Sequence, residues 1–95
     1  MNKTNAMTLE RRVAKRHRVD KPGLIIMPGT VTSLEVTIID INAGGAKLSV
    51  SAVDNVPMKF NLLVVGEKRI LPSLVVWRVN DRVGIRFSGA EIDLA

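Results

Sequence analysis

Apolar and polar residues alternate along much of the chain with the two-residue period of β-strands. Within residues 34–38 the apolar Leu34, Val36 and Ile38 are separated by polar residues, and residues 46–51 follow the same rule. A period of two places successive side chains on opposite faces of a sheet. We therefore predict two half-buried strands in these segments.

Further short strands are predicted from just after Pro22-Gly23 to the C-terminal region. Runs rich in β-branched or aromatic residues cover 60–65, 74–79 and 83–87, and each has the length of a strand. Asn80-Asp81 separates the last two runs with residue types that tolerate a positive φ, so a tight hairpin is expected there. Other breaks are expected where turn residues cluster, at Pro22-Gly23, Pro28-Gly29, residues 55–57 and Gly66-Glu67.

Strands this short would leave exposed edges if they formed an open sheet. Closure into a barrel removes the edges and encloses a single core. We therefore predict an all-β fold, a small six-stranded antiparallel β-barrel over residues 19–95. A short helical turn is expected within residues 89–94.

The composition limits what such a domain can be. With 95 residues the chain forms one domain, and 46% hydrophobic with 24% charged residues is typical of a globular protein. The absence of cysteine and the presence of a single histidine exclude the usual metal clusters. No apolar run approaches the roughly 20 residues of a membrane helix, and residues 1–8 do not resemble a secretory signal. We therefore expect a cytoplasmic protein with no membrane span, no metal and no cofactor.

The net charge of +5 comes entirely from the N-terminal region. Residues 1–21 contain seven basic and two acidic residues, whereas residues 22–95 contain seven of each. We assign residues 1–18 to a basic arm that is mobile without a partner. A basic arm on a neutral body indicates an anionic partner, although a solvated tail that only aids solubility is an equally simple interpretation.

Arginines within the arm follow an RxxxR pattern formed by Arg12 and Arg16, with Arg11 directly before it. A guanidinium group is planar and permanently charged, so it can grip a phosphate with two hydrogen bonds. It can also read the O6 and N7 atoms of guanine or stack on a purine. The pattern alone is common in basic tails.

A second pattern, Asp-x-Asn-x-Gly-Gly, spans residues 40–45 between two predicted strands. Asp40 can accept hydrogen bonds from loop amides or from guanine, and Asn42 offers one acceptor and two donors. Gly45, together with Gly44, allows a positive φ and lets a ligand approach the backbone without a Cβ atom in the way. The alternative is a structural turn in which Asp40 and Asn42 satisfy their own backbone.

These two patterns, in this order, resemble the PilZ domain family, the bacterial receptor modules for cyclic di-GMP. Arg12 and Arg16 match the family's RxxxR motif, and Asp40, 24 residues after Arg16, begins a match to its (D/N)xSxxG motif that ends at Gly45. The resemblance covers approximately residues 10–88. It includes three later segments that resemble the family's strands, residues 44–48, 75–78 and 83–87.

The resemblance implies that the domain is a receptor and not an enzyme. In this interpretation Arg11, Arg12 and Arg16 clamp cyclic di-GMP against the barrel, Asp40 accepts hydrogen bonds from a guanine, and Gly45 holds the turn open. Asn42 occupies the position of the family's serine, so the hydroxyl contact is replaced by an amide. Binding would order the arm and signal to a downstream protein partner.

Two alternatives remain at this point. One is a degenerate PilZ-like domain that binds a protein partner and no nucleotide. The other is a small barrel that binds RNA or single-stranded DNA, which the shortage of aromatic residues disfavours because such barrels stack bases on them. The single tryptophan, Trp77, lies on a predicted strand and is assigned to packing in the core or at the barrel rim, with stacking on a ligand as the less favoured alternative.

Overall fold

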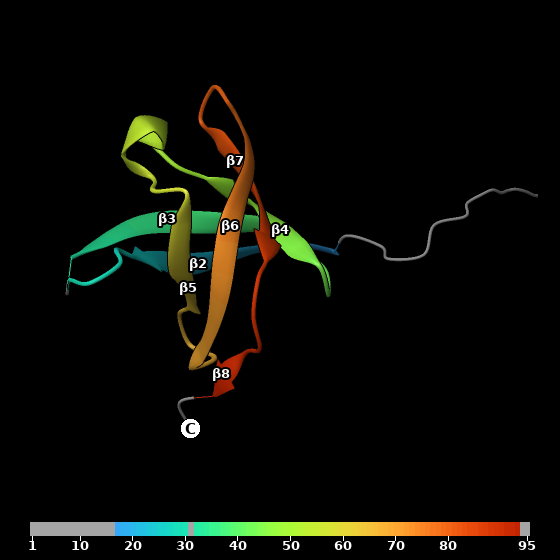
Figure 1. Cartoon of the computed structure of the whole chain (residues 1–95). Coiled ribbons are helices and arrows are strands. Elements are labelled where there is room, and N and C mark those ends of the chain that lie inside the picture. Colours follow the sequence, from blue (N-terminus) through green and yellow to red (C-terminus); the bar gives the residue numbers. More distant parts are fainter. Residues whose placement is uncertain (1–16, 31, 94–95) are drawn as a thin grey trace, which may run out of the picture.

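The computed structural model describes residues 17–30 and 32–93, and regular structure in this part of the chain is almost entirely strand (Figure 1). One 3-10 turn, η2 (Val53–Asn55), joins β4 to β5. The strands in chain order are β2 (His17–Ile26), β3 (Ser33–Ile41), β4 (Gly45–Ser49), β5 (Lys59–Val64), β6 (Arg69–Val79), β7 (Arg82–Phe87) and β8 (Ile92–Asp93).

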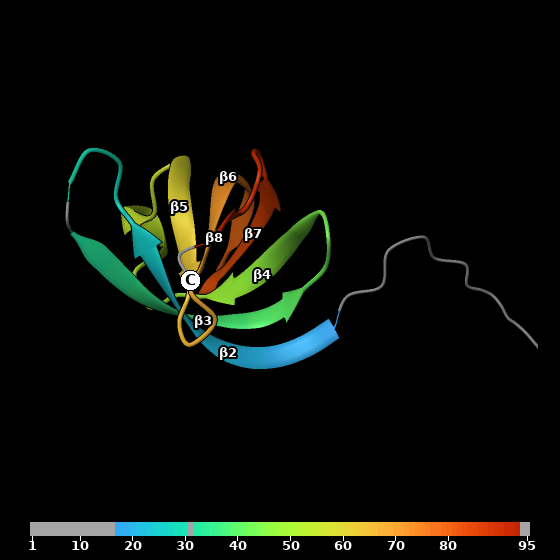
Figure 2. The same ribbon diagram turned by 90° about the horizontal axis from the view of Figure 1, so that it is seen from below.

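Six of these strands close into an antiparallel barrel. Their order in the sheet is β5-β2-β3-β4-β7-β6, and the pairing of β5 with β6 completes the ring. Figure 2 shows the strongly curved sheet in a second view. Both the all-β class and the six-stranded barrel predicted from the sequence are confirmed.

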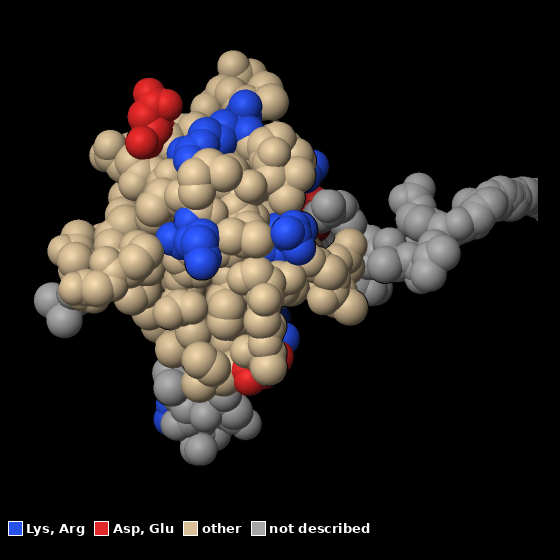
Figure 3. All heavy atoms as spheres, in the orientation of Figure 1, with Lys and Arg blue, Asp and Glu red and all other residues tan. Residues whose placement is uncertain are grey.

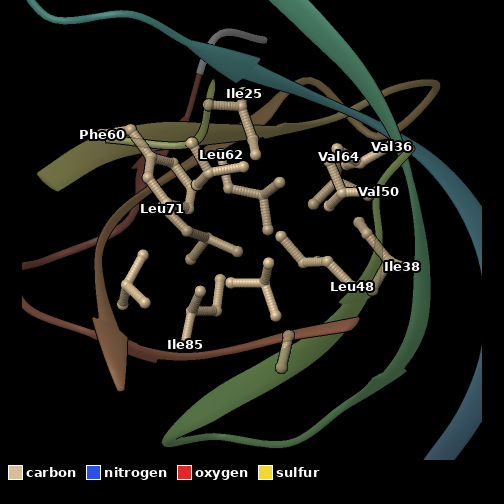
Figure 4. Packing of buried hydrophobic residues seen from close by; sticks show 14 residues of the cluster. Ile25, Val36, Ile38, Leu48, Val50, Phe60, Leu62, Val64, Leu71 and Ile85 are labelled. Atoms are coloured by element: carbon tan, nitrogen blue, oxygen red, sulfur yellow. The ribbon is translucent and has the colours of Figure 1, made fainter. Parts of the chain in front are cut away.

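The inward-facing residues of the barrel form one hydrophobic core. Alternate residues of the predicted strands lie in it, among them Val36, Ile38 and Leu48. Figure 4 shows side chains of every barrel strand meeting in the interior. Full burial of each large aliphatic side chain contributes about 1.5–3 kcal/mol, so the period-two pattern supplies both the strands and the energy that holds them together.

The hairpin predicted at Asn80-Asp81 joins β6 to β7, and Asn80 takes a positive φ of 55°. The break predicted at Pro22-Gly23 is wrong, because both residues lie inside β2. Gly23 pairs with Val36 on one side and Val64 on the other. A Cβ atom at this glycine would lie 3.1 Å from the Ile38 side chain, so the glycine gives close packing and not a turn.

The helical turn predicted near the C-terminus is wrong for the described residues. Ile92 and Asp93 instead form β8, which pairs with Ile70 and Arg69 of β6. The pairing of β6 with β7 ends at Ser73. The part of β6 that precedes Ser73 therefore has a backbone edge that β7 does not cover, and the returning chain pairs with this edge. No helix in residues 17–30 and 32–93 is long and apolar enough to cross a membrane.

Strand β2 begins at His17, so the last two residues of the segment that we assigned to the arm lie in this strand. His17 is the Cα partner of Ile41, and Arg18 is the partner of Asp40. A bulge follows immediately, where the register shifts between Arg18 and Lys21 and Asp20 has a φ of 49°. The N-terminal end of β2 is therefore fixed beside the C-terminal end of β3.

Candidate functional site

Asp40 is one of only two buried polar residues in the described part of the chain. Its side chain is 12% exposed, and the Nζ atom of Lys47 lies 3.6 Å from its Oδ2 atom. Lys47 is also its register partner on β4, while Arg18 is its register partner on β2. A buried carboxylate needs compensating partners, and the Lys47 ammonium group provides one for Asp40 at the end of β3.

Asn42 organises the loop between β3 and β4. Its Oδ1 atom accepts hydrogen bonds from the N–H groups of Gly44 (2.7 Å) and Gly45 (2.9 Å), and its own N–H donates to the carbonyl of Gly45 (2.9 Å). The alternative interpretation, in which Asn42 satisfies its own turn, is thus confirmed for this residue. The amide oxygen is occupied by the loop, so the NH2 group is what Asn42 can offer to a ligand.

Gly45 is required by close packing and not by its backbone conformation. Neither Gly44 nor Gly45 uses the positive φ that a glycine allows, since the glycines with positive φ in the described residues are Gly29 and Gly66. A Cβ atom at Gly45 would lie 2.1 Å from the carbonyl oxygen of Ile85 and 3.1 Å from the Cα of Arg86. The backbone of the loop thus lies close against β7, and the hydrogen bond from Phe87 N–H to Gly44 O (2.9 Å) holds it there.

A row of paired residues crosses four adjacent strands from Asp40. Asp40 of β3 pairs with Lys47 of β4, Lys47 with Gly84 of β7, and Gly84 with Trp77 of β6. A Cβ atom at Gly84 would lie 2.2 Å from the Cε2 and Nε1 atoms of Trp77, so the indole lies directly over this glycine. The row ends in an aromatic side chain that is 37% exposed.

The sequence alone did not assign Lys47 and Trp77 to the site. Both residues line a surface hollow of about 540 Å³ together with residues of the β6–β7 hairpin. Trp77 lies outside the core, where its ring packs on Gly84. The signal that could have found it is Gly84 itself, since a glycine in the outward-facing position between two core residues leaves room for a large neighbour.

Three of the residues assigned to the site from the sequence, Arg11, Arg12 and Arg16, lie outside the described residues. Asp40, Asn42 and Gly45 are described, and the β3–β4 connection brings them together. His17, the first residue of β2, is paired with Ile41, the residue that precedes Asn42. Strand β2 therefore begins beside the β3–β4 loop. Among the described residues, no group of three histidine, cysteine, aspartate or glutamate side chains is arranged to hold a metal ion.

A separate ionic cluster joins the β5–β6 turn to its neighbours. Glu67 forms ion pairs with Lys21 of β2 and with Arg69 of β6 (3.0 Å), and Arg69 also pairs with Glu91 (3.0 Å). Hydrogen bonds, first from Lys21 and then from Arg69, lower the pKa of the Glu67 carboxyl. Hydrogen bonds from Arg69 to Glu91 and Glu67 raise the pKa of Arg69 in turn.

Comparison with known protein families gives one result that covers nearly the whole chain. The model of the PilZ domain family matches residues 10–94. The matched range contains the Arg12–Arg16 pair, the loop from Asp40 to Gly45 and all the strands of the barrel. A search of curated proteins found no match.

Proposed function

The chain belongs to the PilZ domain family, and from this we propose that it is a receptor that binds cyclic di-GMP where the basic arm meets the β3–β4 loop. The observation that carries the proposal is the pairing of His17 with Ile41. Consecutive Cα atoms are about 3.8 Å apart, so Arg16 is tied covalently to a residue beside the loop. Arg12, four residues earlier, is within reach of the same loop.

The chemistry of the two segments suits the two parts of the ligand. Cyclic di-GMP carries two phosphates and two guanines. Arg12 and Arg16, with Arg11, bind phosphate oxygens and guanine edges through paired N–H groups. Asp40 accepts hydrogen bonds from the N1 and N2 donors of a guanine, and the Nζ atom of Lys47, 3.6 Å from its Oδ2 atom, adds a positive charge beside this contact.

Asn42 contributes a donor where the family's motif has a serine. Because its Oδ1 atom holds the amides of Gly44 and Gly45, its NH2 group is the part directed to the nucleotide. Guanine O6 and N7 and the phosphate oxygens are all acceptors that this group can reach. The amide thus supports the loop and contacts the ligand with different atoms.

The row from Asp40 to Trp77 extends the surface available to the ligand. Adjacent strands lie about 4.8 Å apart, and the Trp77 ring reaches back over Gly84 toward Lys47. In our proposal Lys47 attracts a phosphate and the exposed part of the indole stacks on a guanine. These contacts come from the barrel, so they are in place before the arm closes.

Binding orders the arm, and this ordering is the signal. Fixing backbone costs about 1–2 kcal/mol per residue, and charge-assisted hydrogen bonds of about 1.5–3 kcal/mol each offset that cost. Receptor function requires no reaction of the nucleotide, and we propose that the domain has no catalytic step. A downstream protein reads the ordered arm.

Nucleic acid is a weaker candidate for the ligand. Phe60 lies in the core and Phe87 packs against it, which leaves Trp77 as the one aromatic side chain on the outer surface of the described residues. Barrels that bind single strands stack successive bases on several aromatic rings. A single exposed ring suits a ligand with two bases better.

Calorimetric titration with cyclic di-GMP, with GTP as the control nucleotide, tests the proposal. We expect saturable heat with cyclic di-GMP alone. At a ligand concentration a hundredfold above Kd, the protein should be stabilised by about 2.7 kcal/mol. Absence of both heat and a shift in melting temperature would show that the chain is not a cyclic di-GMP receptor.

A further inference from the structure

The outer face of β6 combines exposed aliphatic residues with flanking basic residues. Val76 is 59% exposed and Val79 is 57% exposed, and Leu74 faces outward on the same strand. Lys59 of β5 and Arg86 of β7 are the register partners of Leu74 on its two sides. We call this surface, formed by Leu74, Val76, Val79, Lys59 and Arg86, the β6 face.

The charged residues of the three strands that form this region all have the same sign. Strands β5, β6 and β7 together contain five basic residues and no acidic residue. Arg69 and Arg82 have acidic partners, whereas Lys59 and Arg86 form no ion pair with any described residue. Figure 3 shows basic side chains on this face separated by uncharged surface, with acidic side chains toward the margins.

Because β5, β6 and β7 are all paired within the closed barrel, their backbones offer no edge to which a partner strand could be added. A partner must therefore bind through side chains. Lys59 and Arg86 are each one strand from Leu74, so they lie roughly 10 Å apart. This distance matches the 10–12 Å diameter of an α-helix. A helix that lies along β6 would pack on the aliphatic residues with one basic side chain on each side.

We propose that the β6 face docks an acidic amphipathic helix of a partner protein. The helix would present aliphatic side chains to Leu74, Val76 and Val79, and aspartate or glutamate to Lys59 and Arg86. From Leu74 to Val79 the strand rises roughly 17 Å, the length of about three helical turns. A nucleic acid would find one exposed ring on this stretch of β6, Trp77, whereas barrels that bind single strands stack bases on several rings, and a flat bilayer would touch little of a curved barrel wall. This inference does not depend on nucleotide binding.

Selection of peptides from a random 16-residue display library on the immobilised full chain tests the proposal. We expect enriched peptides to carry aliphatic residues at helical spacing flanked by aspartate or glutamate. Fluorescence anisotropy with the synthetic peptides then gives Kd for each variant. The double variant Lys59→Glu/Arg86→Glu should raise Kd at least tenfold, and a peptide with its acidic residues changed to lysine should recover the affinity for that variant.

Two matched control variants distinguish a loss of binding at the β6 face from the general effect of a reversed charge or of a polar residue in place of a valine. Lys68→Glu changes the same type of charge on the exposed β5–β6 turn, and Val65→Asn is compared with Val76→Asn because both valines are exposed (41% and 59%). Each control should keep Kd within twofold, and circular dichroism should show that all variants are folded. Lack of enrichment, enriched peptides without an acidic excess, or affinity unchanged in the double variant would overturn the proposal. Binding to phosphatidylglycerol vesicles that is lost in the double variant, without peptide binding, would also overturn it.

Discussion

Arg18 of β2 and Asp40 of β3 are Cα partners in the barrel sheet, one step from the first pair, His17 and Ile41. This relationship fixes where the arm joins the barrel. The loop that contains Asn42 begins directly after Ile41, so His17, the residue that follows Arg16 in the sequence, lies beside the Asp40–Gly45 motif although 24 residues separate Arg16 from Asp40.

Replacement of Arg12 or Arg16 by alanine should weaken cyclic di-GMP binding and leave the barrel folded. Loss of one charge-assisted contact of about 1.5–3 kcal/mol corresponds to roughly a 10- to 150-fold higher Kd. Calorimetry of each variant measures the effect, and Lys3→Ala controls for the loss of one positive charge in the arm. Affinity equal to that of the wild type in both arginine variants would show that the arm is not the clamp.

Substitutions at Asn42 should separate its structural role from its binding role. Asn42→Asp keeps an acceptor for the amides of Gly44 and Gly45 but removes the NH2 donor and adds a negative charge, so stability should be retained and nucleotide affinity should fall. Asn42→Ala loses the acceptor as well and should lower the free energy of unfolding by about 1 kcal/mol. Urea denaturation and calorimetry measure the two quantities. Equal stability of the aspartate and alanine variants would contradict the capping role, and Asn42→Ser shows whether the family's residue binds more tightly.

Gly45→Ala should destabilise the barrel, whereas Gly44→Ala should be tolerated. A Cβ atom at position 45 would overlap the carbonyl oxygen of Ile85, which belongs to the backbone and cannot move alone; at position 44 the nearest atom is Asn42 Oδ1, at an ordinary contact distance of 3.5 Å. Overpacking of this kind costs about 1–3 kcal/mol. Thermal and urea denaturation of the pair give the comparison. Similar stabilities for the two variants would mean that the loop can shift away from β7.

The strands and the core could be predicted from the sequence because each depends on local alternation. Val36, Ile38 and Leu48 are identifiable by period alone, and Asn80-Asp81 by turn chemistry. The first part of β2 and of β6 was missed because proline interrupts the pattern. Pro22 lies in β2 and Pro72 in β6, and each still uses its carbonyl, which accepts a hydrogen bond from Val65 and from Ser88 respectively.

The arrangement of the site depends on register, which local patterns do not specify. Lys47, Gly84 and Trp77 come from three strands, and only the ladder of the closed barrel places them in one row with Asp40. The packing constraint at Gly45 could not be predicted for the same reason, since the atoms that a Cβ atom there would meet belong to β7. The motif residues could be found from the sequence, but the surface around them could not.

Stability should fall in acid partly because of Glu67. Its pKa is lowered in the folded state, chiefly by the hydrogen bond from Lys21 and then by that from Arg69. The stabilisation is therefore complete above the unfolded-state pKa near 4.5 and is lost as the pH falls through the lower, folded-state value. Glu67→Gln should be less stable than the wild type at pH 6 by no more than about 1 kcal/mol, because the pairs are partly exposed.

This difference should disappear toward pH 3, and 1 M salt should reduce it at pH 6 because salt screens exposed charges. Urea denaturation across this range measures it. Glu35→Gln is the control, because Glu35 is an exposed residue of β3 that forms no ion pair with another described residue; the difference between this variant and the wild type should change little over the same range. A constant difference between wild type and Glu67→Gln from pH 6 to pH 3 would show that the ionised carboxylate is not the stabilising form.

Gly84→Ala should displace Trp77 with little loss of stability. A Cβ atom at this position would lie 2.2 Å from the indole, but the indole is the outer end of a partly exposed side chain and can rotate away. Because Trp77 is the single tryptophan, its fluorescence reports the displacement directly, and we expect a red-shifted emission. Cyclic di-GMP affinity should fall by about as much as in Trp77→Ala, since both variants remove the stacking surface. A shifted spectrum with unchanged affinity would instead show that the ring only covers the outer face of β7 and that the nucleotide binds without it.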